Sequence, residues 1–165
     1  MTGVGGGRFD PDGTMTRAML AAVLWKRAGK PSVTGAQPFS DVAADAWYAG
    51  AVRWASREGL MNGVDGGLFD PDAPLTREQL AAVFARSAKR AGLDTSGKSD
   101  LSGFTDASGV SPYAADAMGW CVKSGLIGGT DAGALEPRGA ATRAQCAAIL
   151  ARFEKLLPNG NGAKR

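Results

Sequence analysis

The chain has 165 residues, of which 44% are hydrophobic and 21% charged, and its formal net charge is +3. This composition fits one soluble globular unit or a small repeat array, with no apolar stretch long enough for a membrane span and no basic run typical of nucleic-acid binding. Histidine is absent, which removes the commonest general base and metal ligand, so we expect neither an enzyme nor a metal or cofactor site.

The chain repeats itself. Offsets of 60 and 66 residues align GRFDPDGTMTRAMLAAV (7–23), GLFDPDAPLTREQLAAV (67–83) and GALEPRGAATRAQCAAI (133–149). A longer segment, 39–67, also matches 104–133. We therefore divide the chain into a first unit that has only its second half (1–30), a second unit (38–92), a third unit (103–157) and a tail (158–165) that we expect to be disordered. The start inside a unit indicates either a fragment of a longer protein or a natural two-and-a-half-repeat protein whose exposed face a partner covers.

In chain order, the pattern predicts a helix from Thr16, one from near Asp45 to Gly59, one from Thr76, one from near Ser111 to Gly125, and one from Thr142. Threonine is a good N-cap, and Gln79 and Gln145 sit three residues on, as a capping box requires. Met19 holds that place in the first unit and cannot reciprocate. No segment is predicted as a regular strand. A single unit cannot easily bury its apolar face, so the units should share a core in an all-α fold.

Two cysteines, Cys121 and Cys146, lie in the last third of the chain. They form no zinc motif and no CxxC pair. They are interpreted as small buried residues, and the alternative is a disulfide between two packed helices.

Each threonine N-cap is followed by an arginine, Arg17, Arg77 or Arg143. A cation in the first helical turn opposes the helix dipole, so its recurrence needs an explanation. One interpretation is that the guanidinium and the free amides of the helix start hold an anionic group together. The other is an ion pair with the aspartates of the preceding Asp-Pro-Asp segments, Asp10 and Asp12 or Asp70 and Asp72.

The Asp-Pro-Asp segments lack the further oxygen ligands of a calcium loop, so they are interpreted as tight turns. Glycine-rich loops at 3–7, 63–67 and 128–133 complete no nucleotide-binding motif. Glycine there is better explained by turns that need positive φ. Trp54 and Trp120 are expected in the core, whereas Trp47, Tyr48 and Tyr113 at helix starts could either stack on a ligand or pack half-buried.

The register FSDV…WYAGAVRWA…GLMNGVDGGLFDPDAPLTREQLA, with its two partial copies, resembles the S-layer homology family from Gly3 to about Leu156. The resemblance implies three tandem units in a three-pronged pseudo-trimer, with one helix per unit in a central bundle and grooves between the prongs. The family's Thr-Arg-Ala-Glu stretch keeps Thr and Arg three times here, but its fourth position is Met19, Gln79 or Gln145. This puts a polar role of that carboxylate in doubt. The third unit has Leu135-Glu136-Pro137-Arg138 in place of Phe-Asp-Pro-Asp, which puts its groove in doubt.

The resemblance also implies a function. The domain would attach a surface or S-layer-type protein non-covalently to the bacterial cell wall, outside the cell, by binding a pyruvylated secondary cell-wall polysaccharide or another peptidoglycan-linked glycan. Asp41 and Asp106 would either cap a turn or accept a hydrogen bond from the sugar. The alternative function is protein–protein assembly, with self-association through the face left by the missing first helix. The residues expected to bind the ligand are Arg17, Arg77, Arg143, Gly6, Gly7, Gly66, Gly67, Asp41, Trp47 and Asp106.

Overall fold

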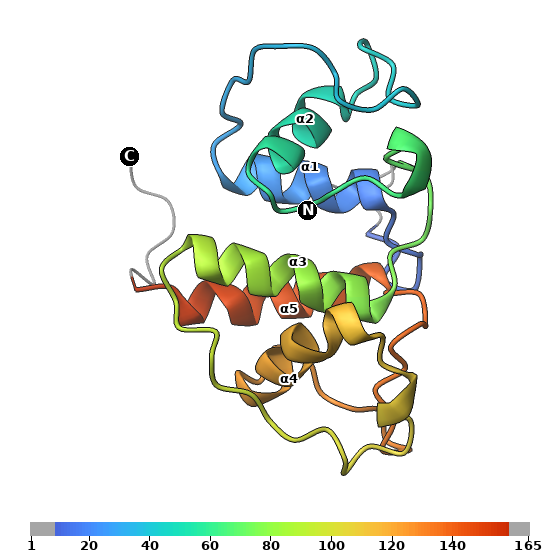
Figure 1. Ribbon diagram of the computed structural model, residues 1–165, viewed down its shortest axis with the longest axis vertical. Coiled ribbons are helices and arrows are strands. Elements are labelled where there is room, and N and C mark those ends of the chain that lie inside the picture. The colour runs from blue at the N-terminus through green and yellow to red at the C-terminus, as the bar shows by residue number, and fades with distance from the viewer. Residues whose placement is uncertain (1–8, 159–165) are drawn as a thin grey trace.

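Five α-helices and three short 3-10 segments form the part of the chain that the structure, a computed structural model, describes: residues 9–158 (Figure 1). The helices are α1 Arg17–Arg27, α2 Ala49–Arg57, α3 Arg77–Arg90, α4 Ala115–Lys123 and α5 Arg143–Leu156, and the 3-10 segments are η1 Asp65–Gly67, η2 Ala107–Gly109 and η3 Pro112–Ala114. Within this range β pairing is confined to isolated bridges, so the all-α prediction is confirmed. Gly6, Gly7 and residues 159–165 of the predicted tail lie outside the described residues. No helix in residues 9–158 has the length and apolar character to cross a membrane.

The three second helices begin where the sequence predicts. Each threonine Oγ accepts a hydrogen bond from the amide three residues on, at 3.3 Å for Thr16, 3.2 Å for Thr76 and 3.1 Å for Thr142. The Oε1 atoms of Gln79 and Gln145 accept a bond from the amide of the N-cap threonine, so both predicted capping boxes form. A cap of this kind stabilises a helix by about 1 kcal/mol.

The first helices begin less predictably. The expected start near Asp45 is wrong, because α2 begins at Ala49 after two successive turns, in which Ala46 donates to the Ala43 carbonyl and Ala49 to the Ala46 carbonyl. The start near Ser111 is confirmed by η3, which leads directly into α4. The glycine stops are also confirmed, since Gly59 and Gly125 have φ of +66° and +68°, which suits glycine.

A closed cycle of backbone hydrogen bonds joins the three units just before their second helices. The amide of Met15 donates to the Ala141 carbonyl (2.9 Å), that of Ala141 to Leu75 (2.7 Å), and that of Leu75 back to Met15 (2.8 Å). All three side chains are fully buried. We call this cycle the backbone triangle. It relates the three units by an approximate threefold arrangement, although the units are far apart in the sequence.

The helix starts extend this arrangement. The first helical amides, those of Arg17, Arg77 and Arg143, donate at 2.9–3.1 Å to the carbonyls of Ala73, Gly139 and Gly13 of a neighbouring unit. The amides of Ala18, Glu78 and Ala144 donate to Pro71, Pro137 and Pro11, each at 2.9 Å. These first-turn amides are therefore already satisfied, and the interpretation that they bind an anion is wrong.

The arginine side chains clamp the units together. Arg17 donates from Nε to the Phe69 carbonyl (2.6 Å) and from Nη2 to the Asn62 carbonyl (2.7 Å). Equivalent bonds join Arg77 to the carbonyls of Leu135 (2.6 Å) and Gly128 (3.0 Å), and Arg143 Nε to the Phe9 carbonyl (3.0 Å).

The clamping arginines are buried, and in the described part of the chain the charges of Arg17 and Arg77 are not balanced by a direct ion pair. The three arginines are only 5–7% exposed. Burial lowers the pKa of Arg17 and Arg77, and nearby carboxylates partly offset this effect. The ion pairs within residues 9–158 are Arg27–Glu154, Arg90–Glu58 and Lys98–Asp116, so the ion-pair interpretation is wrong for Arg17 and Arg77. Backbone carbonyls of a neighbouring unit compensate the cation at these helix starts.

Two helix pairs flank the triangle. α1 packs against α2 and α3 packs against α4, so the second helices of the first two units each pack against the first helix of the next unit (Figure 1). α5 lies beside α3, with the rings of Phe84 and Phe153 5.3 Å apart, and no further helix within residues 9–158 pairs with it. Leu20, Leu80 and Cys146 occupy equivalent positions and are fully buried between the units. The arrangement with three complete prongs stays a prediction.

Cys121 and Cys146 are both free and fully buried, so they are small core residues and the alternative disulfide is not formed. Burial raises the pKa of each thiol to about 12. The indole rings of Trp54 and Trp120 are buried as expected.

Substituting Arg77→Ala should lower the free energy of unfolding by about 3 kcal/mol, because two hydrogen bonds from a charged group are lost and the carbonyl of the buried Leu135 is left unpaired. Urea unfolding followed by circular dichroism measures this change. Arg57→Ala, which removes an exposed arginine from the end of α2, is the control and should cost much less. Equal losses for the two variants would contradict the clamp.

The two cysteines should resist a thiol reagent at pH 8 in the native protein, because thiols with a pKa of about 12 are almost entirely protonated there and are also covered. Both should react fully in guanidinium chloride without a reductant. A native-state reaction as fast as that of the unfolded chain would show that the core around α4 and α5 is open.

Candidate functional site: the grooves between repeat units

A groove of about 410 Å³ lies where the second unit meets the arginine of the first. We call it the first groove, and it is lined by Arg17, Met61, Asn62, Gly63, Val64, Leu75, Gln79, Ala82, Val83, Arg86 and Tyr113. Its floor is the α3 surface, and one wall is the loop 61–64. The exposed Tyr113, at the start of the next unit's first helix, stands at its rim.

A second groove of about 280 Å³ repeats this construction one unit later. It is lined by Arg77, Leu126, Ile127, Gly128, Gly129, Thr130, Gln145, Ala148, Ile149 and Arg152, most of which align with residues of the first groove. No counterpart of Tyr113 stands at its rim, because α5 has no paired first helix in the described part of the chain.

A third hollow of about 360 Å³ lies between α1 and α5. Its described lining includes Arg143, Lys26 and the 66%-exposed Trp47, which stands at the helix start where Tyr113 stands in the first groove. The aligned loop would fall in residues 1–4, outside the described residues. The structure thus places Arg17, Arg77, Arg143 and Trp47, all predicted from the sequence, at hollows between units.

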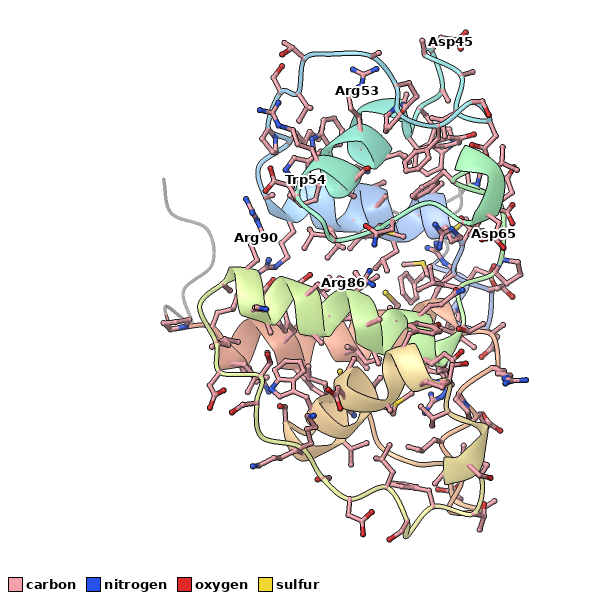
Figure 2. All side chains as sticks on the ribbon, in the orientation of Figure 1. Asp45, Arg53, Trp54, Asp65, Arg86 and Arg90 are labelled. Atoms are coloured by element: carbon pink, nitrogen blue, oxygen red, sulfur yellow. The ribbon has the colours of Figure 1, made fainter. Side chains whose placement is uncertain are left out.

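All three grooves combine a buried arginine with a second, exposed cation. Arg86, Arg152 and Lys26 are that second cation, at aligned positions of α3, α5 and α1. Arg86 donates to the Leu60 carbonyl (3.2 Å) and Arg152 to Leu126 (3.1 Å), which turns each side chain toward the loop wall. Figure 2 shows Arg86 on the side of α3 that faces the first two helices. No aspartate or glutamate is among the described lining residues of any groove.

The clamp leaves part of two guanidinium groups uncommitted. Nε and Nη2 of Arg17 and Arg77 hold carbonyls, while Nη1 has no hydrogen-bond partner within residues 9–158. Both side chains line their grooves. An arginine pinned on one edge by the fold can present its remaining N–H groups to a ligand without losing side-chain entropy.

Asp41 and Asp106 support turns. Asp41 accepts bonds from the amides of Phe69 (2.8 Å) and Asp70 (2.7 Å), and Asp106 accepts bonds from those of Leu135 and Glu136, both at 2.7 Å. Burial opposes ionisation of Asp41, but these hydrogen bonds outweigh it and lower its pKa. The pKa of Asp106 is also lowered, chiefly by the bond from Leu135. Of the two interpretations, turn capping is the one that the geometry shows, and neither residue lines a groove.

These turns are strained and need support. Asp10, Asp70 and Glu136 have φ of 52–55°, a left-handed conformation that is uncommon outside glycine. Each carbonyl accepts a bond from the amide three residues on, so the interpretation as tight turns is confirmed. Gly66 and Gly67 have φ of +73° and +75°, as expected, but they are exposed in η1 outside the lining of the first groove.

Two contributions were missed from the sequence. The second cation of each groove was visible in the repeat alignment as a basic residue ten positions after the threonine cap. Glu78 gave no such signal, because the other units have alanine there. It is buried, accepts two bonds from Ser111 (2.8 and 2.9 Å), and lies 3.3 Å from the Tyr113 hydroxyl.

Comparison with known proteins identifies the family. The family model of the S-layer homology domain matches residues 38–81 and 103–147, more than half of the chain. The surface-layer 125 kDa protein of Lysinibacillus sphaericus is 34% identical over 88% of this chain, which is 12% of that protein. The S-layer protein sap of Bacillus anthracis is 32% identical over 91% of the chain and 17% of its own length. The exoglucanase XynX of Acetivibrio thermocellus is 32% identical over 87% of the chain and 13% of its own length.

The chain thus spans less than a fifth of each of these relatives. Some relatives are surface-layer proteins and others are enzymes, and in both kinds the similarity is confined to a part of about this length. The shared part is therefore a module that occurs both in surface-layer proteins and in enzymes. The chain belongs to the S-layer homology domain family, whose members are proteins of the bacterial cell surface.

Proposed function

We propose that this domain anchors a surface protein to the bacterial cell wall by binding an acidic, pyruvylated wall polysaccharide in the grooves between its units. The observation that carries the proposal is the charge of these grooves. Each places a buried arginine and an exposed cation on its lining, without a carboxylate among the described lining residues. Family membership supports the same role, since the relatives include surface-layer proteins.

A pyruvate ketal carries one carboxylate on a compact, otherwise neutral sugar. In the first groove, that carboxylate would accept bonds from the free Nη1 of Arg17 and from Arg86. A guanidinium plane suits a carboxylate well, and bonds between charged partners are about twice as strong as neutral ones. The exposed Gly63 lies on the loop wall of the groove, and Tyr113 offers a flat face at the rim.

The first groove is the most complete of the three within residues 9–158. Its arginine, loop, second-helix floor and rim aromatic are all described, whereas the second groove has no rim aromatic. A groove with more of these contacts buries more of the sugar. We therefore assign the stronger binding to the first groove and the weaker binding to the second.

A second candidate function, self-association, is favoured by one observation on α5. Ala147, Ala148 and Ala151 lie along one face of this helix and are exposed or half-buried. On α3, which packs against α4, the counterparts of Ala147 and Ala148 are the buried Ala81 and Ala82, and the counterpart of Ala151 is the half-buried Ala85. A second copy that supplied a helix to this face would bury the same kind of contact.

Removing the second cation should weaken glycan binding. Arg86→Gln is expected to lower the affinity for pyruvylated wall polysaccharide about fivefold, which corresponds to one partly exposed charge contact. Arg152→Gln should have a smaller effect because its groove is less complete. Isothermal titration calorimetry measures both, with the same polymer after mild acid removal of the ketal as the control. Equal binding of the two polymers would refute recognition of the carboxylate.

Self-association through α5 predicts a monomer–dimer equilibrium in sedimentation velocity that Ala151→Arg abolishes, because a long charged side chain would have to be buried in the interface. Ala44→Arg adds the same charge to an exposed loop and should leave the equilibrium unchanged. A protein that stays monomeric over a wide concentration range would remove this candidate function.

A further inference from the structure

Another basic hollow, distinct from the three grooves, adjoins the first groove. Its volume is about 440 Å³, and it lies between α3, α4 and the linker that joins them. The linker passes from the end of α3 toward α4 (Figure 1), where Ser99 donates to the Gly119 carbonyl (3.0 Å) and Trp120 to the Asp94 carbonyl (3.2 Å). We call it the outer hollow, and it is lined by Ala82, Ala85, Arg86, Lys89, Thr95, Ser96, Lys98, Tyr113, Asp116, Ala117 and Trp120.

The outer hollow is positively charged. Arg86, Lys89 and Lys98 line it together with a single carboxylate, Asp116. Lys98 pairs with Asp116 at 2.6 Å. Lys89 is exposed and belongs to none of the ion pairs found within residues 9–158. The lining therefore keeps an excess of positive charge after its own ion pair is counted.

The first groove and the outer hollow share a wall, which consists of Ala82, Arg86 and Tyr113. The tyrosine is 58% exposed, so its ring can be reached from solvent. Its hydroxyl lies 3.3 Å from Oε1 of the buried Glu78, which also fixes Ser111 through two bonds. This network holds the ring in place between the two hollows. The first and third units have alanine in place of Glu78 and cannot form it.

We propose that the first groove and the outer hollow form one continuous site for an acidic polysaccharide that is longer than one of its own repeating units. One acidic sugar occupies the first groove, the chain crosses the face of Tyr113, and the next acidic group along the polymer lies against Lys89 and Lys98. This inference rests on the proposed function of the first groove and extends it from a single sugar to a stretch of polymer.

The physical basis is multivalency. Once the first acidic sugar is held, the second contact is made within the complex at high effective concentration, so even a weak charge contact increases affinity. The contact involves exposed lysines, so salt should screen it readily. The second groove cannot be extended in this way within residues 9–158, since α5 has neither a paired helix nor a linker beside it.

The test compares short and long fragments of pyruvylated wall polysaccharide, separated by size, in calorimetric titrations of the intact chain. The double variant Lys89→Gln/Lys98→Gln removes both lysine charges of the outer hollow but leaves Arg86 and every other lining residue of the first groove in place. The control is Lys155→Gln, which removes the lysine at the position of α5 that aligns with Lys89. Thermal melts verify that the variants are folded.

We expect the wild-type chain to bind long fragments about fivefold more tightly than short ones, with the difference lost in high salt. The double variant should bind both lengths as the wild type binds the short fragment, and the control variant should behave as the wild type. A length preference that survives in the double variant, or that is absent from the wild type, overturns the continuous site while leaving the first groove intact. Failure of the wild type to bind either length would overturn the proposed function as well.

Discussion

The backbone triangle formed by Met15, Leu75 and Ala141 is the constraint on which the rest of the structure depends. It sets the three second helices in one cyclic order and brings the start of each helix against the turn of a neighbouring unit. The arginine clamps follow from this placement, because a side chain in the first helical turn can then reach carbonyls 45 to 58 positions away in the sequence. The grooves follow in turn, since each is the space between a clamped arginine, the loop it holds and the next helix.

One residue type therefore serves both stability and the proposed binding. Burying a guanidinium is costly unless its donors are satisfied, and backbone carbonyls of a neighbouring unit satisfy two of them for Arg17 and for Arg77. Those bonds also fix the orientation of the group, so the N–H groups that remain are held in place at the groove lining before any ligand arrives. A mobile surface arginine would have to be ordered on binding, at a cost in side-chain entropy. The second cation of the first groove, Arg86, is exposed and is held by one loop carbonyl, that of Leu60, whereas Arg17 is buried and held by two.

Local chemistry explains which parts of this could be predicted from the sequence. The helices that start at Thr76 and Thr142 are encoded within four residues, and their capping boxes form as predicted. The tight turns and the glycine stops are local in the same sense. The partners of Arg77 could not be predicted, because a backbone carbonyl has no sequence signature and its position depends on how the units assemble. The helix start predicted at Asp45 was wrong for a related reason. Aspartate is a favourable N-cap, but here two turns through Ala43 and Ala46 come before α2. Glu78 has no counterpart in the other units, so the repeat alignment concealed it.

The closure of the backbone triangle has a consequence for how such a domain comes apart. In an open solenoid each repeat touches only its neighbours, so an end repeat can fray or be trimmed while the others persist. Here each unit both donates to and accepts from the other two, and none is an end repeat. Loss of one unit would leave buried donors and acceptors exposed on both survivors. An all-or-none unfolding transition follows from this topology, because no unit can open while the other two keep their hydrogen-bond partners.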